Sequence, residues 1–111
     1  MLMVDTSRYA RHISLPGVGI EGQRSISKSR ILVVGAGGLG SPVLLYLAAA
    51  GIGEIGVIDD DLVDSSNLQR QIIHGESNVG YSKVASAKAQ ILSINSTIKV
   101  TTWETRLSPD N

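Results

Sequence analysis

Three glycines at fixed spacing are the residues of this sequence best suited to binding an anion. Gly35, Gly37 and Gly40 form the pattern G-x-G-x-x-G between two apolar stretches. The first glycine permits a tight turn, the second lets a phosphate approach the backbone, and the third lets a helix lie close to a strand. Free N–H groups at the start of that helix attract negative charge. The pattern predicts a site for nucleotide phosphates.

An acidic residue follows this turn at the separation typical of nucleotide-binding folds. Asp59 ends the next apolar run, roughly 20 residues beyond the turn. A carboxylate at that point can accept hydrogen bonds from ribose hydroxyls. Together the turn and Asp59 fit either a dinucleotide or ATP. The competing interpretation, a glycine turn that only packs a helix on a strand, is disfavoured by this context.

Cations beyond Asp59 distinguish the two nucleotides. Asn67 and Arg70 follow the second apolar run, and Lys83 opens a later helical stretch. Hydride transfer needs few cations there, whereas nucleotidyl transfer needs several, because negative charge develops on the attacked phosphorus and on the leaving pyrophosphate. Arg70 suits two-point phosphate contacts and Lys83 suits a point charge. Each alone would be an ordinary surface cation, but together they favour ATP.

Four longer motifs give nearly the whole chain a resemblance to a known family. The first motif, RYARHISLPGVGIEGQ, begins at Arg8, and the second, GAGGLGSP, begins at Gly35. The third begins at Asp59 and reads DDDLVDSSNLQRQ, followed by IIHG. The fourth, VGYSK, ends at Lys83. This combination resembles the ThiF/MoeB/HesA adenylyltransferases, relatives of the ubiquitin-activating enzymes. The similarity is strongest to the molybdopterin-synthase type, which is sometimes fused to a rhodanese domain.

The resemblance implies an enzyme that uses ATP and Mg²⁺ to adenylate the C-terminal glycine of a ubiquitin-like sulfur-carrier protein, in molybdopterin or thiamine sulfur transfer. It puts Gly38 beside the phosphates and Asp59 beside the ribose. It also implies a homodimer in which Arg11 reaches into the partner's site. The triphosphate would be held by three residues: Asn67, Arg70 and Lys83.

The sequence also departs from that family. Members are considerably longer and carry, further along, an aspartate that helps to hold Mg²⁺, two CxxC zinc motifs and often a reactive cysteine. Zinc is therefore expected only beyond Asn111, and these 111 residues alone are expected to be inactive. Among the acidic residues after the second apolar run, Asp61 is the one to test for a role at the nucleotide.

Two other functions stay open at this point. The glycine turn and Asp59 alone would suit a nicotinamide- or flavin-dependent oxidoreductase, which would bind NAD tightly and ATP not at all. A non-catalytic fragment, or a degenerate subunit paired with an active partner, would fit the missing second half of the fold. The retention of Arg70 and Lys83 speaks against degeneration.

Composition excludes several classes of function. Ten basic and ten acidic residues cancel, so the chain has no strong field for nucleic acid or an anionic membrane. The absence of cysteine excludes disulfides, thiolate zinc sites and cysteine nucleophiles within this chain. Because Asp5, Arg8 and Arg11 lie near the N-terminus, we do not expect a signal peptide. We therefore expect a cytoplasmic protein.

The expected fold is α/β: a Rossmann-like half with a parallel sheet, preceded by N-terminal helices. Residues 1–28 form a helical segment, with helices over 5–13 and 19–28, and residues 29–111 form the ATP-binding domain. Its pattern is strand-helix-strand-helix-strand, with a polar loop or short helical turn at 65–71. The expected strands are 30–34, 54–58 and 97–103, and the helices are 41–50 and 80–94.

Two features point to incompleteness. The helix at 42–50 has no charge, so it needs cover from a partner subunit, from missing sequence or from the N-terminal segment alone. The chain also ends after the third strand, which suggests truncation.

His12 and His74 lack an evident catalytic partner and are expected to serve packing or hydrogen bonding. Trp103 is expected to pack in the core or on an edge strand.

Overall fold

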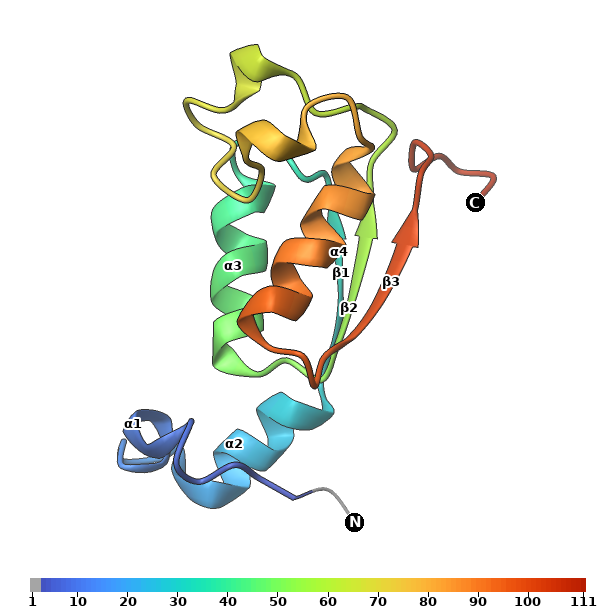
Figure 1. Cartoon of the computed structure of the whole chain (residues 1–111). Helices are drawn as coiled ribbons and strands as arrows, with labels where there is room; N and C mark the ends of the chain where they lie inside the picture. Colours follow the sequence, from blue (N-terminus) through green and yellow to red (C-terminus); the bar gives the residue numbers. More distant parts are fainter. Residues whose placement is uncertain (1–2) are drawn as a thin grey trace.

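A parallel three-stranded sheet forms the centre of the molecule in the computed structural model, which describes residues 3–111 (Figure 1). The strands pair in the order β1-β2-β3, so β2 is central. Helix α3 connects β1 to β2 and helix α4 connects β2 to β3. The bounds are Arg30–Val34 for β1, Gly40–Ala50 for α3, Glu54–Ile58 for β2, Lys83–Ile94 for α4 and Lys99–Trp103 for β3.

Both connecting helices cover the same face of the sheet (Figure 1). Successive parallel crossovers of one hand carry each helix to the same side. Apolar side chains between the two layers form the core, and they include Leu44 of α3, Ile55 and Val57 of β2 and Ile91 of α4, all without solvent exposure. The expected α/β order and its parallel strands are confirmed.

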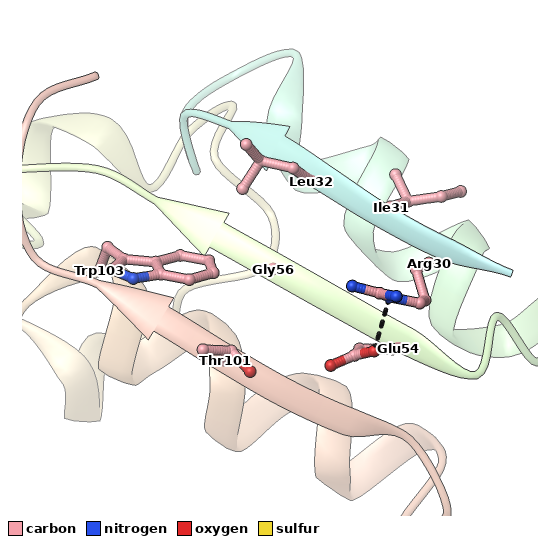
Figure 2. Close-up of a pocket in the computed structure, with 7 residues that line it drawn as sticks. All are labelled: Arg30, Ile31, Leu32, Glu54, Gly56, Thr101 and Trp103. Carbon is pink, nitrogen blue, oxygen red and sulfur yellow. Dashed lines mark ion pairs between the residues drawn. The ribbon is translucent and has the colours of Figure 1, made fainter. Parts of the chain in front are cut away.

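No helix of the described residues covers the opposite face of the sheet (Figure 1). Leu32 and Val34 of β1 are 50% and 59% exposed. Figure 2 shows Trp103 lying across Gly56 on this face, with the Arg30–Glu54 ion pair nearer the start of the strands. A Cβ on Gly56 would stand 2.8 Å from the Trp103 ring, so the indole position depends on that glycine. The expectation that Trp103 packs on an edge strand is confirmed.

The N-terminal segment contains α1 (Ala10–Ile13) and α2 (Gly19–Lys28), and it docks where α3 and α4 end (Figure 1). Gln23 of α2 is fully buried; its amide donates to the carbonyl of Ala50 (3.0 Å), and its oxygen lies 2.7 Å from His12 Nδ1. These contacts satisfy carbonyls at a helix end that would otherwise lack partners. Hydrogen bonding is thus the role of His12, as expected.

Asn95 makes the second polar connection at this end of the molecule. Its side-chain amide donates to the Tyr9 hydroxyl (2.9 Å) and to the carbonyl of Ala48 (3.2 Å). Asn95 is 1% exposed and caps the end of α4. One side chain therefore joins the N-terminal segment to both helices.

Three expected elements are longer than the observed ones, and local hydrogen bonds explain each difference. The helix predicted over 5–13 is observed only as α1, Ala10–Ile13. Before it, the Asp5 carboxylate accepts hydrogen bonds from the N–H groups of Ser7 and Arg8, and the chain forms a turn instead. The helix predicted from residue 80 begins only at Lys83. Gly80 has φ +91°, and Ser82 caps the helix by accepting from Ala85 N–H.

The third strand is likewise shorter than the predicted range 97–103, because the Asn95 side-chain oxygen accepts from both the backbone and the hydroxyl of Thr97. The strand begins at Lys99. The polar stretch after β2 contains a 3₁₀ turn at Ser65–Asn67, in agreement with the prediction, and a second 3₁₀ turn at Glu76–Asn78 was not expected.

The uncharged helix α3 keeps an exposed apolar surface. Val43 is 47% exposed and Tyr46 77%, and Leu39, just before the helix, is 88% exposed. The N-terminal segment meets α3 only at its C-terminal end, so the proposal that this segment alone buries the helix is wrong. None of the helices in residues 3–111 has the length and apolarity needed to cross a membrane.

We predict that Asn95→Ala lowers the free energy of unfolding by about 2–3 kcal/mol, because two buried hydrogen bonds are lost. Asn111→Ala is the control, since Asn111 is exposed, and its effect should stay within about 0.5 kcal/mol. Urea unfolding followed by circular dichroism measures both. Equal stability of the two variants would contradict the joining role of Asn95.

Candidate nucleotide-binding site

The glycine turn lies between β1 and α3, at the carboxyl edge of the sheet. Gly35 has φ +95°, a conformation that favours glycine, and its N–H donates to Ile58 of β2 (2.8 Å). A Cβ on Gly40 would overlap the carbonyl of Gly35, so the close approach of the helix to the strand requires glycine there. The structural roles predicted for these two glycines are confirmed.

Ala36, inside the turn, is anchored on both sides. Its N–H donates to the Asp59 carboxylate at 2.9 Å, and its carbonyl oxygen lies 2.8 Å from Nε2 of His74. The other Asp59 oxygen accepts from Asp61 N–H at 2.8 Å. Asp59 therefore holds the turn as well as the start of the following loop, a structural task that the sequence did not indicate.

His74 is buried between the turn and α4. Its Nδ1 lies 2.7 Å from the hydroxyl of Ser86, which is itself buried. Burial lowers the pKa of His74, and the positive charge of Lys83 lowers it further. The hydrogen bond to Ala36 and the negative charge of Asp59 act in the opposite direction. Because Ser86 is 3% exposed, this pair serves hydrogen bonding, as expected for His74, and is closed to a substrate.

The loop after Asp61 folds back over the turn. Asp64 caps the 3₁₀ turn, because its carboxylate accepts from the hydroxyl and the backbone N–H of Ser66, and these bonds lower the pKa of Asp64. The carbonyl of Asn67 then accepts from the N–H of Gln71 at 2.9 Å. This turn of the backbone directs the side chains of Arg70 and Gln71 toward the glycines.

Arg70 and Gln71 cover the middle of the glycine turn. A Cβ on Gly38 would stand 3.5 Å from Cδ of Arg70, and a Cβ on Gly37 would stand 3.6 Å from Nε2 of Gln71. Arg70 is exposed, whereas Gln71 is buried, and its Oε1 has no hydrogen-bond partner in the described chain. The same holds for the buried hydroxyl of Ser41 in the first turn of α3. Polar groups thus remain available beside the turn.

Lys83 begins α4 at the same edge of the sheet. Its Nζ lies 3.6 Å from Oδ2 of Asp61, and its backbone N–H donates to the Asp61 carbonyl at 3.0 Å. The side chain is only 7% exposed. The structure therefore brings Gly37, Gly38, Asp59, Arg70 and Lys83 to one end of the sheet.

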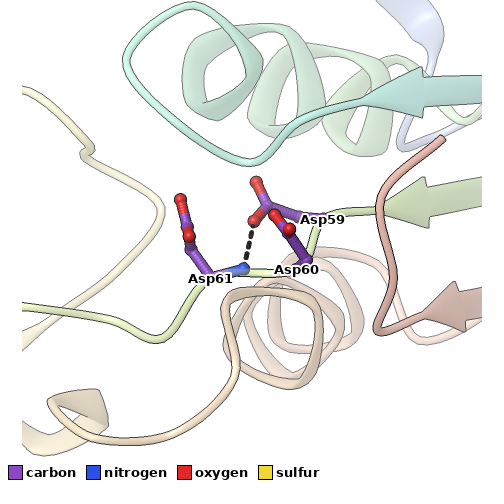
Figure 3. Close-up of side chains that lie close together, drawn as sticks. All are labelled: Asp59, Asp60 and Asp61. Carbon is purple, nitrogen blue, oxygen red and sulfur yellow. Dashed lines mark hydrogen bonds between the residues drawn. The ribbon is translucent and has the colours of Figure 1, made fainter. Parts of the chain in front are cut away.

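Three carboxylates lie together just after β2 (Figure 3). Asp59, Asp60 and Asp61 each offer an oxygen, and these oxygens lie within 4.8 Å of one another. Asp60 and Asp61 are exposed. Carboxylate oxygens with free space for water suit Mg²⁺, which keeps several waters when bound.

Arg11 lies apart from these residues. It is exposed on α1, at the end of the molecule opposite the glycine turn (Figure 1). The 11 residues of α3 span about 16 Å between the two ends. Arg11 therefore does not join the site of its own chain.

Sequence reasoning did not place Ser41 or Gln71 beside the glycine turn, and it did not connect the hydrogen bonding of His74 with that turn. All three lie inside the motifs that carry the family resemblance, in GAGGLGSP, DDDLVDSSNLQRQ and IIHG. The available signal was their position within those motifs, because a serine, a glutamine or a histidine has no diagnostic spacing of its own.

A glycine turn at the carboxyl edge of a parallel sheet, with an acidic residue ending the second strand, defines the Rossmann class of nucleotide-binding folds. The chain belongs to the ThiF family, whose sequence profile matches residues 9–111.

Relatives with similar sequences have adenylyltransferase names. The chain is 54% identical over 107 residues to the probable adenylyltransferase/sulfurtransferase MoeZ of Mycobacterium tuberculosis, covering 96% of this chain and 27% of that protein. It is 58% identical over 104 residues to adenylyltransferase and sulfurtransferase MOCS3-1 of Zea mays, covering 94% of this chain and 22% of that protein. The chain thus spans about a quarter of the length of these relatives.

Solved structures with the same fold contain nucleotides. The tRNA N6-threonylcarbamoyladenosine dehydratase TcdA of E. coli in complex with ATP matches with a TM-score of 0.91 and 34% identity, covering all of this chain and 46% of that one. E. coli MccB with ATP matches with a TM-score of 0.80 and 33% identity, covering 89% and 31%.

We predict that the protein loses stability as the pH falls below about 6.5, the ordinary pKa of histidine. The lowered pKa of folded His74 means that the unfolded chain binds a proton that the native state does not, so the free energy of unfolding rises with pH in this window. Urea unfolding of the protein and of His74→Gln above and below that pH measures the effect. An equal pH dependence in both proteins would contradict it.

Proposed function

We propose that this chain is the nucleotide-binding part of an adenylyltransferase that uses ATP. The observation that carries the proposal is the position of Arg70 over Gly38, with the buried cation of Lys83 at the same edge of the sheet. Such cations suit a triphosphate whose charge shifts toward pyrophosphate during the reaction. The adenylyltransferase names of the relatives and the ATP in two structural neighbours support it.

Asp59 is proposed to bind the ribose while it holds the turn. Each carboxylate oxygen accepts one backbone N–H, from Ala36 or from Asp61. A carboxylate has about four acceptor sites, so capacity remains for ribose hydroxyls. Asn67 is proposed to assist at the triphosphate, because its 3₁₀ turn ends three residues before Arg70 and its carbonyl accepts from the Arg70 N–H at 3.2 Å.

Mg²⁺ is the proposed companion of the nucleotide. Asp61, with Asp59 and Asp60 beside it, offers the hard oxygen ligands that this ion prefers. When bound, the ion neutralises charge on the phosphates. The ion pair with Lys83 would hold the Asp61 carboxylate near the phosphates.

The proposed acceptor is the C-terminal glycine carboxylate of a ubiquitin-like sulfur-carrier protein. A carboxylate oxygen attacks the α-phosphorus of ATP, the bond from that phosphorus to the β-bridging oxygen breaks, and pyrophosphate leaves with the electron pair. The product is a mixed anhydride, the acyl-adenylate, which can then accept sulfur. The combined adenylyltransferase and sulfurtransferase names of the relatives support this choice.

A homodimer is proposed to complete the site. Leu39, Val43 and Tyr46 form an exposed apolar surface along α3 that is suited to a partner. Arg11 lies too far from its own glycine turn to act there, so its proposed task is to contact the nucleotide of the partner subunit (Figure 1).

We predict that Arg70→Ala weakens ATP binding by about 10- to 100-fold, because charge-assisted hydrogen bonds to phosphate are lost. Arg30→Ala is the matched control: Arg30 is exposed, pairs with Glu54 on the sheet face and should leave the affinity unchanged. Isothermal titration with ATP and Mg²⁺ measures both. Tight NAD binding without ATP binding would instead support an oxidoreductase.

We predict that two inactive variants restore activity to each other if Arg11 acts across a dimer. Arg11→Ala and Arg70→Ala chains, each completed with the remainder of the M. tuberculosis relative, should each lose ATP–pyrophosphate exchange. Random mixing should recover about a quarter of the unmodified rate, because half of the dimers are mixed and each contains one intact site. No recovery in dimers shown to be mixed would exclude the exchange of Arg11 between subunits.

A further inference from the structure

The peptide group that joins Ala36 to Gly37 has an unusual environment for the middle of a glycine turn. Its carbonyl oxygen points at the buried imidazole of His74, with 2.8 Å between that oxygen and Nε2. Ala36 has no exposed surface and His74 is 7% exposed. The carbonyl is therefore directed into the protein and is bonded there.

The direction of this carbonyl determines the direction of the next N–H. A trans peptide is planar, and its C=O and N–H bonds point to opposite sides. With the Ala36 carbonyl held by His74, the N–H of Gly37 points away from His74. The side chains of Arg70 and Gln71 lie close to Gly38 and Gly37 in the same turn. Within residues 3–111, neither the N–H of Gly37 nor that of Gly38 has a hydrogen-bond acceptor.

We propose that His74 is a positioning residue that keeps the N–H of Gly37 turned toward the phosphates of the nucleotide. The inference rests on the proposed function, in which ATP phosphates lie on the glycine turn. His74 itself is buried and touches no phosphate. It acts through one peptide group.

The chemistry of the two neighbours decides which nitrogen carries the proton. A carbonyl oxygen only accepts, so Nε2 of His74 must donate to Ala36. In the neutral ring Nδ1 is then an acceptor, and it accepts a hydrogen bond from the Ser86 hydroxyl, with 2.7 Å between Nδ1 and Oγ. The Ala36 carbonyl thereby selects the tautomer, and the Ser86 hydroxyl, which can donate or accept, completes the hydrogen bonding of the ring.

Charges around His74 come from two elements. Lys83 approaches from α4 and lowers the pKa of His74, whereas Asp59 approaches from the end of β2 and raises that pKa. Asp59 also holds the N–H of Ala36, so both peptide groups flanking Ala36 are fixed from different segments.

Loss of the imidazole donor would favour rotation of this peptide. A buried carbonyl without a partner costs about 1–3 kcal/mol. Rotation toward solvent would relieve that cost, but it would turn the Gly37 N–H inward and present a carbonyl oxygen to the phosphates. A hydrogen-bond donor would then be replaced by a repulsive dipole.

Two substitutions separate hydrogen-bond donation from packing. His74→Gln keeps an N–H donor, whereas His74→Met has comparable bulk and no donor. We expect His74→Met to raise the Kd for ATP about tenfold and His74→Gln to stay within about threefold of the original protein. Adenosine, which lacks phosphates, should bind both variants as it binds the original, as measured by NMR titration. Equal weakening by both variants, or equal weakening for ATP and adenosine, would overturn the proposal.

A second measurement needs neither a substitution at His74 nor bound ATP. In the ¹⁵N spectrum of the free protein, His74 should carry its proton on Nε2, and the Gly37 amide should exchange faster with solvent than the Ala36 amide. Ser86→Ala removes the hydrogen bond to Nδ1 but leaves the Ala36 carbonyl, so the ring proton should stay on Nε2 and the loss of ATP affinity should be smaller than in His74→Met. A proton on Nδ1 in the original protein would contradict the role of His74.

The two measurements also distinguish this inference from the proposed function. If the original protein binds no ATP, the proposed nucleotide chemistry fails. The tautomer and the Gly37 exchange rate still decide whether His74 sets the direction of the peptide.

Discussion

The conformation of the glycine turn depends on two hydrogen bonds to Ala36 from segments far along the chain. Asp59 holds its N–H from the end of β2, and His74 holds its carbonyl from the loop before α4. Parallel strands bring these segments together, because their carboxyl ends lie at the same edge of the sheet. The unbonded amides of Gly37 and Gly38, the guanidinium of Arg70 and the ammonium of Lys83 therefore lie at one edge of the sheet, where displacing either segment would disturb the turn.

The two ends of α3 have different tasks. Its N-terminal end carries the turn and the polar side chains around it, whereas its C-terminal end is joined to the N-terminal segment by the buried amides of Gln23 and Asn95. The length of the helix separates binding chemistry from this docking contact. The two sides of α3 also differ in burial: Leu44 and Ala48 face the core, while Val43 and Tyr46 remain exposed.

Regular elements were predictable because their signals are local. The apolar runs at 30–34 and 54–58 and the glycines around 41–50 specify strands and a helix through periodicity, capping and backbone conformation. The two helices and the strand that were predicted to begin at residues 5, 80 and 97 begin later in the structure. The side chains of Asp5, Ser82 and Asn95 form hydrogen bonds to nearby backbone groups at these positions. Such bonds compete with helix and strand formation without changing the apolar pattern.

The sequence by itself determined the family, the order of the elements and the presence of a glycine turn followed by Asp59, Arg70 and Lys83, because these are motifs with fixed spacing. Only the tertiary structure decided that His74 and Gln71 support the turn, and that Arg11 lies at the opposite end. Those facts depend on which distant residues the crossovers bring together. A single histidine or arginine carries no sign of its eventual neighbours, since they are chosen by the packing of the helices on the sheet.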